Sequence, residues 1–181
     1  GTLTATGDII VRTASIDRVV GAAGSAVIGA ITSSLGNVSV IGSGVTGLSL
    51  QGPVSAGSGS TIRRILLSGY SDRGASVSGG GYGINAFNTA TLTATGDVII
   101  NAYGDGATTA LRLLKNVTST VRGNIVFSAT DTAAYYAQAI DGSLVATNGS
   151  ITLQGATYVN GVIEPAPGTP ATASDRGVRL N

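Results

Sequence analysis

The sequence predicts an all-β protein, a parallel β-helix (β-solenoid) whose coils hold about 26–30 residues each. The first observation is an internal repeat: TLTATGD stands at residues 2–8 and again at residues 91–97, each time before a run of Val and Ile. The second is a set of glycines at nearly regular intervals, each of which begins a run with alternating apolar residues. The third is composition, because 28 Gly with a single Glu and a single Lys disfavour helices. A repeated unit of this kind buries its apolar side only against stacked neighbours.

Composition also limits the function. Only 10% of the residues are charged, against roughly 25% in a typical soluble domain, and the net charge is +1. We therefore expect no partner that is recognised through a basic surface, nucleic acid included. Without Cys or His the chain lacks disulfides, thiolate metal ligands and the commonest general base. We expect no cofactor, no metal site and no catalytic residue.

The stretch 19–31 (VVGAAGSAVIGAI) is uncharged, but it is much shorter than the roughly 20 residues that a membrane-spanning helix needs. We expect a buried strand with a tight corner here and no membrane insertion. The chain starts with neither a Met nor a signal-peptide pattern, which predicts a processed product or an excised segment.

Corners of the coil are expected where a Gly is followed by Asp, Asn or Ser. The residues two and four positions after each such Gly are apolar, as in a strand with one buried side. Asp, Asn and Ser favour turns by bonding their own backbone. The expected corners are Gly7-Asp8, Gly36-Asn37, Gly96-Asp97, Gly123-Asn124 and Gly149-Ser150.

The spacing of these corners distinguishes a solenoid from a β-sandwich. The steps from Gly7 to Gly36, from Gly96 to Gly123 and from Gly123 to Gly149 are nearly equal, whereas the interval from Gly36 to Gly96 is about twice as long. That interval accommodates two turns, and the missing corner is expected near Gly69. A sandwich would instead give hairpin signals about every 8–12 residues. We expect residues 1–181 to form one solenoid of about six to seven coils.

The third element of each coil is ambiguous in the sequence. Residues 107–114 (ATTALRLL) and 134–141 (AYYAQAID) favour short helical turns by propensity. The stacked context favours strands, which is our prediction. Residues 164–173 hold three of the four prolines and are predicted to form a loop or linker.

The aspartates of the chain have an alternative interpretation, in which they form a chemical site instead of structural corners. Asp8, Asp97, Asp105, Asp131 and Asp141 are candidates for calcium binding or for glycoside cleavage, which needs two carboxyl groups at a defined separation. Asp8 and Asp97 stand at corners where other coils carry Asn or Ser, so we interpret them as turn residues.

Four residues are candidates for surface recognition: Arg63, Arg64, Tyr70 and Tyr82. Arg63-Arg64 is the only adjacent basic pair and is expected at an exposed rim. The six tyrosines would suit carbohydrate stacking, although aromatic side chains on sheets usually pack against neighbours.

The threonines of residues 2–6 and 91–95 alternate with Leu and Ala, so all of them are expected to point outward. High strand propensity explains outward threonines. Ice binding, which occurs on solenoids with threonine ladders, is the alternative interpretation.

Three runs carry a resemblance to a known group: TLTATGDIIVRT, TLTATGDVIINA and GSLVATNGSITLQGA. They resemble repeats of filamentous-haemagglutinin-like exoproteins, which bacteria secrete by the two-partner or autotransporter routes. The resemblance implies a right-handed β-helical rod that is extracellular or on the bacterial surface. Such rods serve as adhesins or as stalks. No catalytic motif is shared, so no functional residue is carried over.

We therefore expect an adhesive or structural segment whose partners are host-cell or surface glycans or proteins, or copies of itself. Outward loops at 42–64, 78–90 and 160–176 would provide the recognition. One alternative is a filament subunit that stacks end to end. The other is a β-helical carbohydrate-active enzyme, which would depend on acids such as Asp105 or Asp131.

Overall fold

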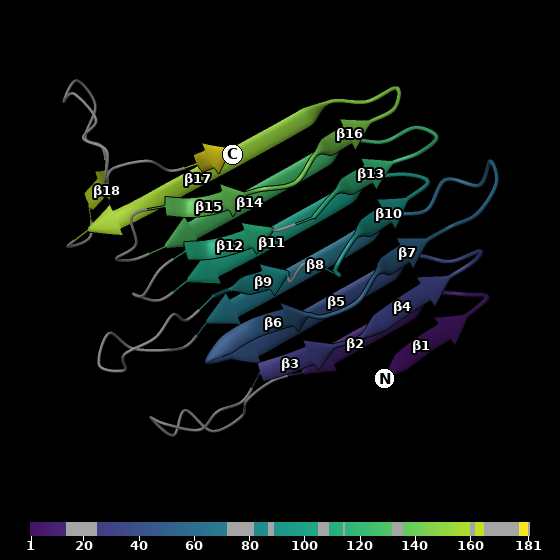
Figure 1. Cartoon of the computed structure of the whole chain (residues 1–181), viewed down its shortest axis with the longest axis horizontal. Helices are drawn as coiled ribbons and strands as arrows, with labels where there is room; N and C mark the ends of the chain where they lie inside the picture. Colours follow the sequence, from purple (N-terminus) through teal and green to yellow (C-terminus); the bar gives the residue numbers. More distant parts are fainter. Residues whose placement is uncertain are drawn as a thin grey trace.

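The computed structural model describes residues 1–13, 25–71, 82–86, 89–104, 109–113, 115–131, 136–159, 162–164 and 178–180. Every regular element in these residues is a strand, and the strands coil into a β-solenoid (Figure 1). Each coil contributes one strand to each of three sheets, so the strand order within a sheet advances by three, except at the end of the chain, where the additional strand β18 joins sheet B and β19 follows β15 in sheet C. The predicted all-β parallel solenoid is confirmed.

The three sheets, which we name A, B and C, run along the solenoid. Sheet A contains β1 (Thr2–Ala5), β4 (Ala30–Ser33), β7 (Val54–Ala56), β10 (Leu92–Ala94), β13 (Val117–Ser119) and β16 (Leu144–Ala146). Sheet B contains β2 (Ile9–Thr13), β5 (Val38–Gly44), β8 (Ile65–Ser71), β11 (Val98–Gly104), β14 (Ile125–Asp131), β17 (Ile151–Val159) and β18 (Val162–Glu164). Sheet C contains β3 (Ser25–Ile28), β6 (Thr46–Leu50), β9 (Ile84–Ala86), β12 (Thr109–Leu113), β15 (Tyr136–Ile140) and β19 (Val178–Leu180).

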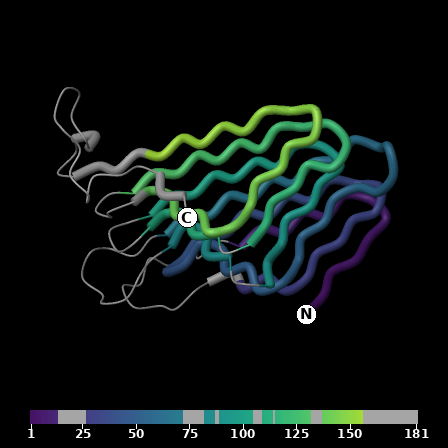
Figure 2. Tube along the Cα trace, turned by 45° about the horizontal axis from the view of Figure 1, so that its top comes forward, coloured from purple at the N-terminus to yellow at the C-terminus, as the bar shows by residue number. Residues whose placement is uncertain are grey.

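Neighbouring coils pair in parallel, and β1 and β17 lie toward opposite ends of the stack (Figures 1 and 2). The exception is β18, which pairs antiparallel with Thr157–Val159 at the end of β17. The ambiguous segments at 107–114 and 134–141 hold β12 and β15, so the prediction of strands there is confirmed. They pair in parallel, with Thr109 beside Tyr136.

The strands of sheet B stay aligned from coil to coil although the coils differ in length. The first inward column of this sheet runs through Ile9, Val38, Ile65, Val98, Ile125 and Ile151, and all of these except Ile151 are buried. The step from Ile65 to Val98 is longer than the predicted coil of about 26–30 residues. The other steps along this column fall within the predicted range.

The predicted corner at Gly69 is wrong. Gly69 lies inside β8, paired with Gly42 and Ala102. Arg63-Arg64 occupies the corner position of this coil, because it directly precedes Ile65. The turn is made by the longer connection before it, in which Gly57 and Gly59 have positive φ values of 83° and 62°. Only glycine adopts this backbone region without steric cost.

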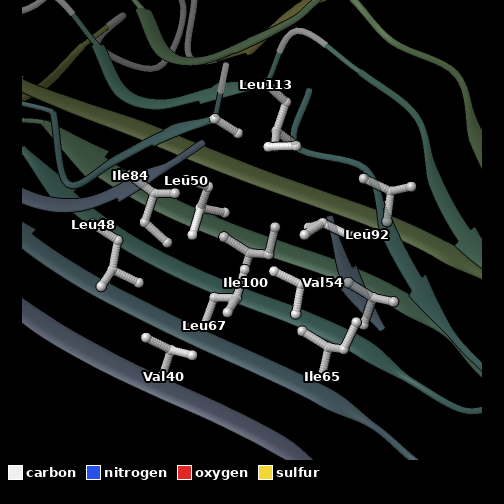
Figure 3. Close-up of a cluster of buried hydrophobic side chains, with 14 of the residues drawn as sticks. Val40, Leu48, Leu50, Val54, Ile65, Leu67, Ile84, Leu92, Ile100 and Leu113 are labelled. Carbon is white, nitrogen blue, oxygen red and sulfur yellow. The ribbon is translucent and has the colours of Figure 1, made fainter. Parts of the chain in front are cut away.

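The core consists of apolar side chains that point inward from all three sheets in stacked columns (Figure 3). In sheet B one column runs through Val40, Leu67, Ile100 and Phe127, none of which has exposed surface. Ile31, Val54 and Leu92 form a column in sheet A, and Leu48 and Ile84 one in sheet C. Burying one such side chain contributes about 1.5–3 kcal/mol, so stacking is the main source of stability.

Two further expectations about connecting segments are corrected. The segment 42–64, expected as an outward loop, contains β6 and β7 and the end of β5, so residues 57–64 form its one long loop and residues 51–53 a short connection. Thr95, expected to point outward, is 4% exposed because its hydroxyl bonds to that loop. Of the expected loop at 78–90, residues 78–81 and 87–88 lie outside the described residues, and β9 occupies Ile84–Ala86. Most of the segments 160–176 and 164–173 also lies outside the described residues, and β18 ends at Glu164.

In the described part of the chain no helix is long and apolar enough to span a membrane.

Candidate functional site

The outward side of sheet B is the candidate contact surface. Outward residues alternate with buried ones along β5, β11 and β14, and the register gathers them into three columns along the solenoid. The aliphatic column contains Ile10, Ser39, Leu66, Ile99, Val126 and Thr152. The middle column contains Arg12, Ile41, Ser68, Asn101, Ser128 and Gln154. The tyrosine column contains Ser43, Tyr70, Tyr103 and Thr130. We call these residues together the sheet-B face.

The sheet-B face is almost uncharged, and its apolar side chains are concentrated in the aliphatic and tyrosine columns. Ile10 is 63% exposed, Tyr70 47% and Tyr103 38%, while Leu66 and Ile99 are half-buried. Of the residues named for this face, Arg12 alone carries a charge. A surface of this kind gives contact area by packing and little recognition by charge.

The outward side of sheet A has a different character. Its central outward column contains Thr4, Thr32, Ser55, Thr93, Thr118 and then Val145. Five successive coils therefore present a hydroxyl group at the same position. The contrast between a hydroxylated sheet A and an apolar sheet B makes sheet B the side that gains more from being covered.

The sequence identified one of the two tyrosines of this face, Tyr70, and missed the other, Tyr103. Tyr70 and Tyr103 stand beside each other in adjacent strands, but the sequence pattern selected Tyr70 and Tyr82. Tyr82 is half-buried two residues before the start of β9, where its carbonyl oxygen accepts the N–H of Gly47 at 3.0 Å. It therefore borders sheet C and is not part of the sheet-B face. Tyr103 could have been found only from the strand register. The coil between Ile65 and Val98 is longer than the others, so a constant period does not align Tyr103 with Tyr70.

Arg63 and Arg64 lie at a corner rather than on a recognition loop. The Arg63 guanidinium donates hydrogen bonds to the carbonyl oxygens of Leu35 and Ile62, so it holds two corners together. Arg64 is exposed, and its backbone N–H donates to Asn37 Oδ1 at 3.1 Å. The pair joins neighbouring coils, and one exposed guanidinium does not form a basic patch.

The corner side chains accept hydrogen bonds from backbone N–H groups of the next coil. The sequence predicts instead that they bond the backbone of their own turn. Asp8 Oδ1 accepts the N–H of Asn37 at 2.6 Å, and Asp97 Oδ1 accepts the N–H of Asn124 at 2.8 Å. Asn124 Oδ1 in turn accepts the N–H of Ser150 at 2.9 Å. The side-chain oxygens of Asp8, Asp97 and Asn124 therefore accept hydrogen bonds that join neighbouring coils.

The carboxylates that the structure describes do not gather into a metal-binding group. Asp131 is fully buried at an inward position of β14, with an oxygen 2.1 Å from where a Cβ on Gly104 would lie. Asp141 is exposed and follows β15, while Asp105 lies outside the described residues. Among the residues that the structure describes, no group of three or more His, Cys, Asp or Glu could hold a metal ion.

Comparison of the sequence with protein-family models, with curated proteins and with solved structures gave no match. The resemblance to haemagglutinin-like exoproteins therefore stays an expectation that rests on the repeats.

Proposed function

We propose that the chain is a structural and adhesive β-solenoid segment of a secreted or surface-displayed bacterial exoprotein, and that it makes its contacts through the sheet-B face. The observation that carries the proposal is the unequal character of the outward faces. Sheet B presents Ile10, Tyr70, Tyr103 and the half-buried residues of the aliphatic column, whereas sheet A presents hydroxyl groups. An extended apolar surface on a soluble fold marks an interaction site.

The continuous core supports the structural part of the proposal. Columns such as Val40, Leu67, Ile100 and Phe127 pass through consecutive coils without a polar interruption. Nearest-neighbour stacking of this kind gives a stiff rod whose length grows with each coil. A stiff rod is suited to carry a contact surface away from its point of attachment.

Adhesion of the recombinant chain to host cells and to immobilised glycans and glycoproteins tests the proposal. Ile99→Lys places a charge in the aliphatic column, and Thr93→Lys places the same charge on sheet A as a matched control. We expect Ile99→Lys to reduce adhesion at least about tenfold and Thr93→Lys to leave it unchanged. Equal adhesion of both variants, or release of oligosaccharides from the glycans by the chain, would contradict the proposal.

A second candidate function, a filament subunit that stacks end to end, has one observation in its favour. At the edge formed by β1, β2 and β3, an open hollow of about 440 Å³ is lined by Leu3, Val11 and Ile28 among others. Unpaired strand edges of this kind can accept another parallel coil. Fibres in electron micrographs that lengthen with protein concentration would support this candidate, and their absence would exclude it.

A further inference from the structure

The size of the sheet-B face is sufficient for a protein interface. Six parallel strands spaced about 4.8 Å apart, with six to seven residues of about 3.3 Å each, cover about 600 Å². Two such faces in contact would bury about 1,200 Å², which is the lower bound for specific protein–protein interfaces.

The charge on the face favours a partner that is equally uncharged. Arg12, the charged member, lies in β2 at the edge of the sheet, so the central strands β8, β11 and β14 present no charge outward. An uncharged apolar face avoids the desolvation cost that buried charges impose. A second copy of the same face satisfies this condition.

Around the tyrosine pair, the polar groups that a glycan would meet are mainly single hydroxyls, with Ser43 and Thr130 beside the pair in its column. Carbohydrate and other small-ligand sites combine apolar contact with several convergent polar groups. Next to the tyrosine pair, Ser68 is only 7% exposed, and the Ser128 hydroxyl lies 3.4 Å from Gln154 Oε1. Asn101 is the side-chain amide that lies next to Tyr70 and Tyr103 and could bond a sugar there.

The columns are complementary to themselves under a two-fold rotation. Rotation about an axis parallel to the solenoid reverses the strand direction but keeps the order of the coils. The aliphatic column of one copy then faces the tyrosine column of the other: Leu66 opposite Tyr70, Ile99 opposite Tyr103, Val126 opposite Thr130 and Ser39 opposite Ser43. The middle column faces itself. Apolar side chains meet in the coils of Leu66 and Ile99, serine meets serine in the coil of Ser39, and Val126 meets the methyl-bearing Thr130. In the self-facing middle column mostly polar side chains meet their own copies, and Arg12 meets Arg12 at the edge of the sheet.

From this arrangement we propose that the sheet-B face is the interface of a symmetric dimer, in which two copies pack face to face with parallel solenoid axes. The two sheets would lie about 10 Å apart with their strands within about 30° of each other, as in β-sandwiches. The inference rests on the proposed function and names a second copy of the chain as the occupant of this face. Adhesion then belongs to the paired rod, and Ile99→Lys reduces adhesion by separating the two copies.

The first test is the oligomeric state of the purified chain, measured by analytical ultracentrifugation over a concentration series. We expect a monomer–dimer equilibrium that Ile99→Lys weakens at least about tenfold and Thr93→Lys does not change. Circular dichroism of both variants shows that the solenoid is intact. A wild-type chain that stays monomeric up to about 100 μM, or an Ile99→Lys variant that dimerises normally, would overturn the dimer.

The second test depends on the predicted pairing. A mixture of Ile99→Lys with Tyr103→Glu places Lys opposite Glu on one side of the axis and keeps the native Ile–Tyr contact on the other. We expect the mixture to associate more strongly than either variant alone. Since the chain has no Cys, Asn101→Cys treated with a short bis-maleimide should give covalent dimers, whereas Thr93→Cys should not. No gain in the mixture, or equal cross-linking of both Cys variants, would refute the proposed symmetry.

The outcomes also separate this inference from the proposed function. If the chain is monomeric and Ile99→Lys still reduces adhesion, the dimer is wrong and the proposed function holds. If glycan binding accompanies the monomer and Tyr103→Ala abolishes it, the face binds glycans instead of a second copy. If neither association nor adhesion depends on Ile99, both proposals fail.

Discussion

The corner glycines of this solenoid, apart from Gly7 in the first coil, are required by how closely two coils approach each other. A Cβ on Gly36 would lie 2.2 Å from the carbonyl carbon of Gly7, and one on Gly123 would lie 2.3 Å from that of Gly96. Neither Gly36 nor Gly123 is among the residues with positive φ. The reason for glycine at these corners is therefore space and not backbone conformation.

This explanation predicts that the same substitution has different effects at two corners. Gly123→Ala should destabilise the chain by about 1–3 kcal/mol, because its Cβ meets the backbone of the preceding coil. Gly7→Ala is the matched control, since a Cβ there has no heavy atom within 4 Å, and its effect should stay within about 0.5 kcal/mol. Urea denaturation followed by circular dichroism measures both. Equal destabilisation would show that glycine is needed at these corners for a different reason.

At the residue scale the sequence located the corners but not their bonding. The corners could be predicted because a Gly followed by Asp, Asn or Ser recurs at nearly regular intervals. The partner of Asp97 is the N–H of Asn124, which belongs to the next coil along the chain. A bond over that distance depends on the register, which no local pattern specifies.

Among the elements, the connection between β7 and β8 departs most from the repeat. Residues 57–64 replace a short corner, and Thr95 of the next coil holds them in place. Thr95 Oγ1 accepts the N–H of Arg63 at 2.9 Å and donates to the carbonyl of Thr61 at 2.5 Å. The position of Thr95 in the TLTATGD repeat indicated an outward side chain, but a longer loop in the preceding coil gave its hydroxyl two partners.

Removing this hydroxyl should loosen the loop and leave the sheets intact. Thr95→Val keeps the shape but loses both hydrogen bonds, each with a net contribution of about 0.5–1.5 kcal/mol. We expect faster proteolysis within residues 57–64 and faster amide exchange at Arg63. Thr93→Val, an outward change on sheet A, is the control and should change neither. Unaltered proteolysis of Thr95→Val would mean that the hydroxyl does not hold the loop.

The same loop explains why one coil was assigned wrongly from the sequence. Arg63-Arg64 has neither the Gly nor the polar acceptor of the other corners, so the regular spacing led to Gly69 instead. Because Tyr103 becomes a neighbour of Tyr70 only through this coil, the tyrosine pair was missed for the same reason. Strand type was predictable, since alternation and propensity are local properties.

For the whole molecule, stability should vary along the solenoid because each coil contacts only its neighbours. Phe127, Ile100 and Leu67 in the middle coils are fully buried, whereas Leu3 in the first coil is 47% exposed and Ile151 in the last described coil is 46% exposed. Coils with less buried surface open at lower free energy.

Hydrogen exchange of the whole chain should show this gradient. We expect the slowest amides in β8, β11 and β14, and exchange at least about tenfold faster in β1 and β16. The measurement is mass spectrometry of peptides from each coil under conditions that favour the native state. Uniform protection from β1 to β16 would show that the solenoid opens as a single cooperative unit.

The variable corner between sheets A and B shows where this architecture tolerates additional chain. Only residues 95–97 connect β10 to β11, whereas residues 57–64 connect β7 to β8, yet Val38, Ile65 and Val98 remain in register. Doubling the length of a flexible loop costs only about 0.6 kcal/mol. A foreign peptide inserted between the exposed Gly59 and Ser60 would be carried outside the strand ladder. The solenoid therefore has the properties of a display scaffold, in which a grafted epitope stands at a fixed height along the rod.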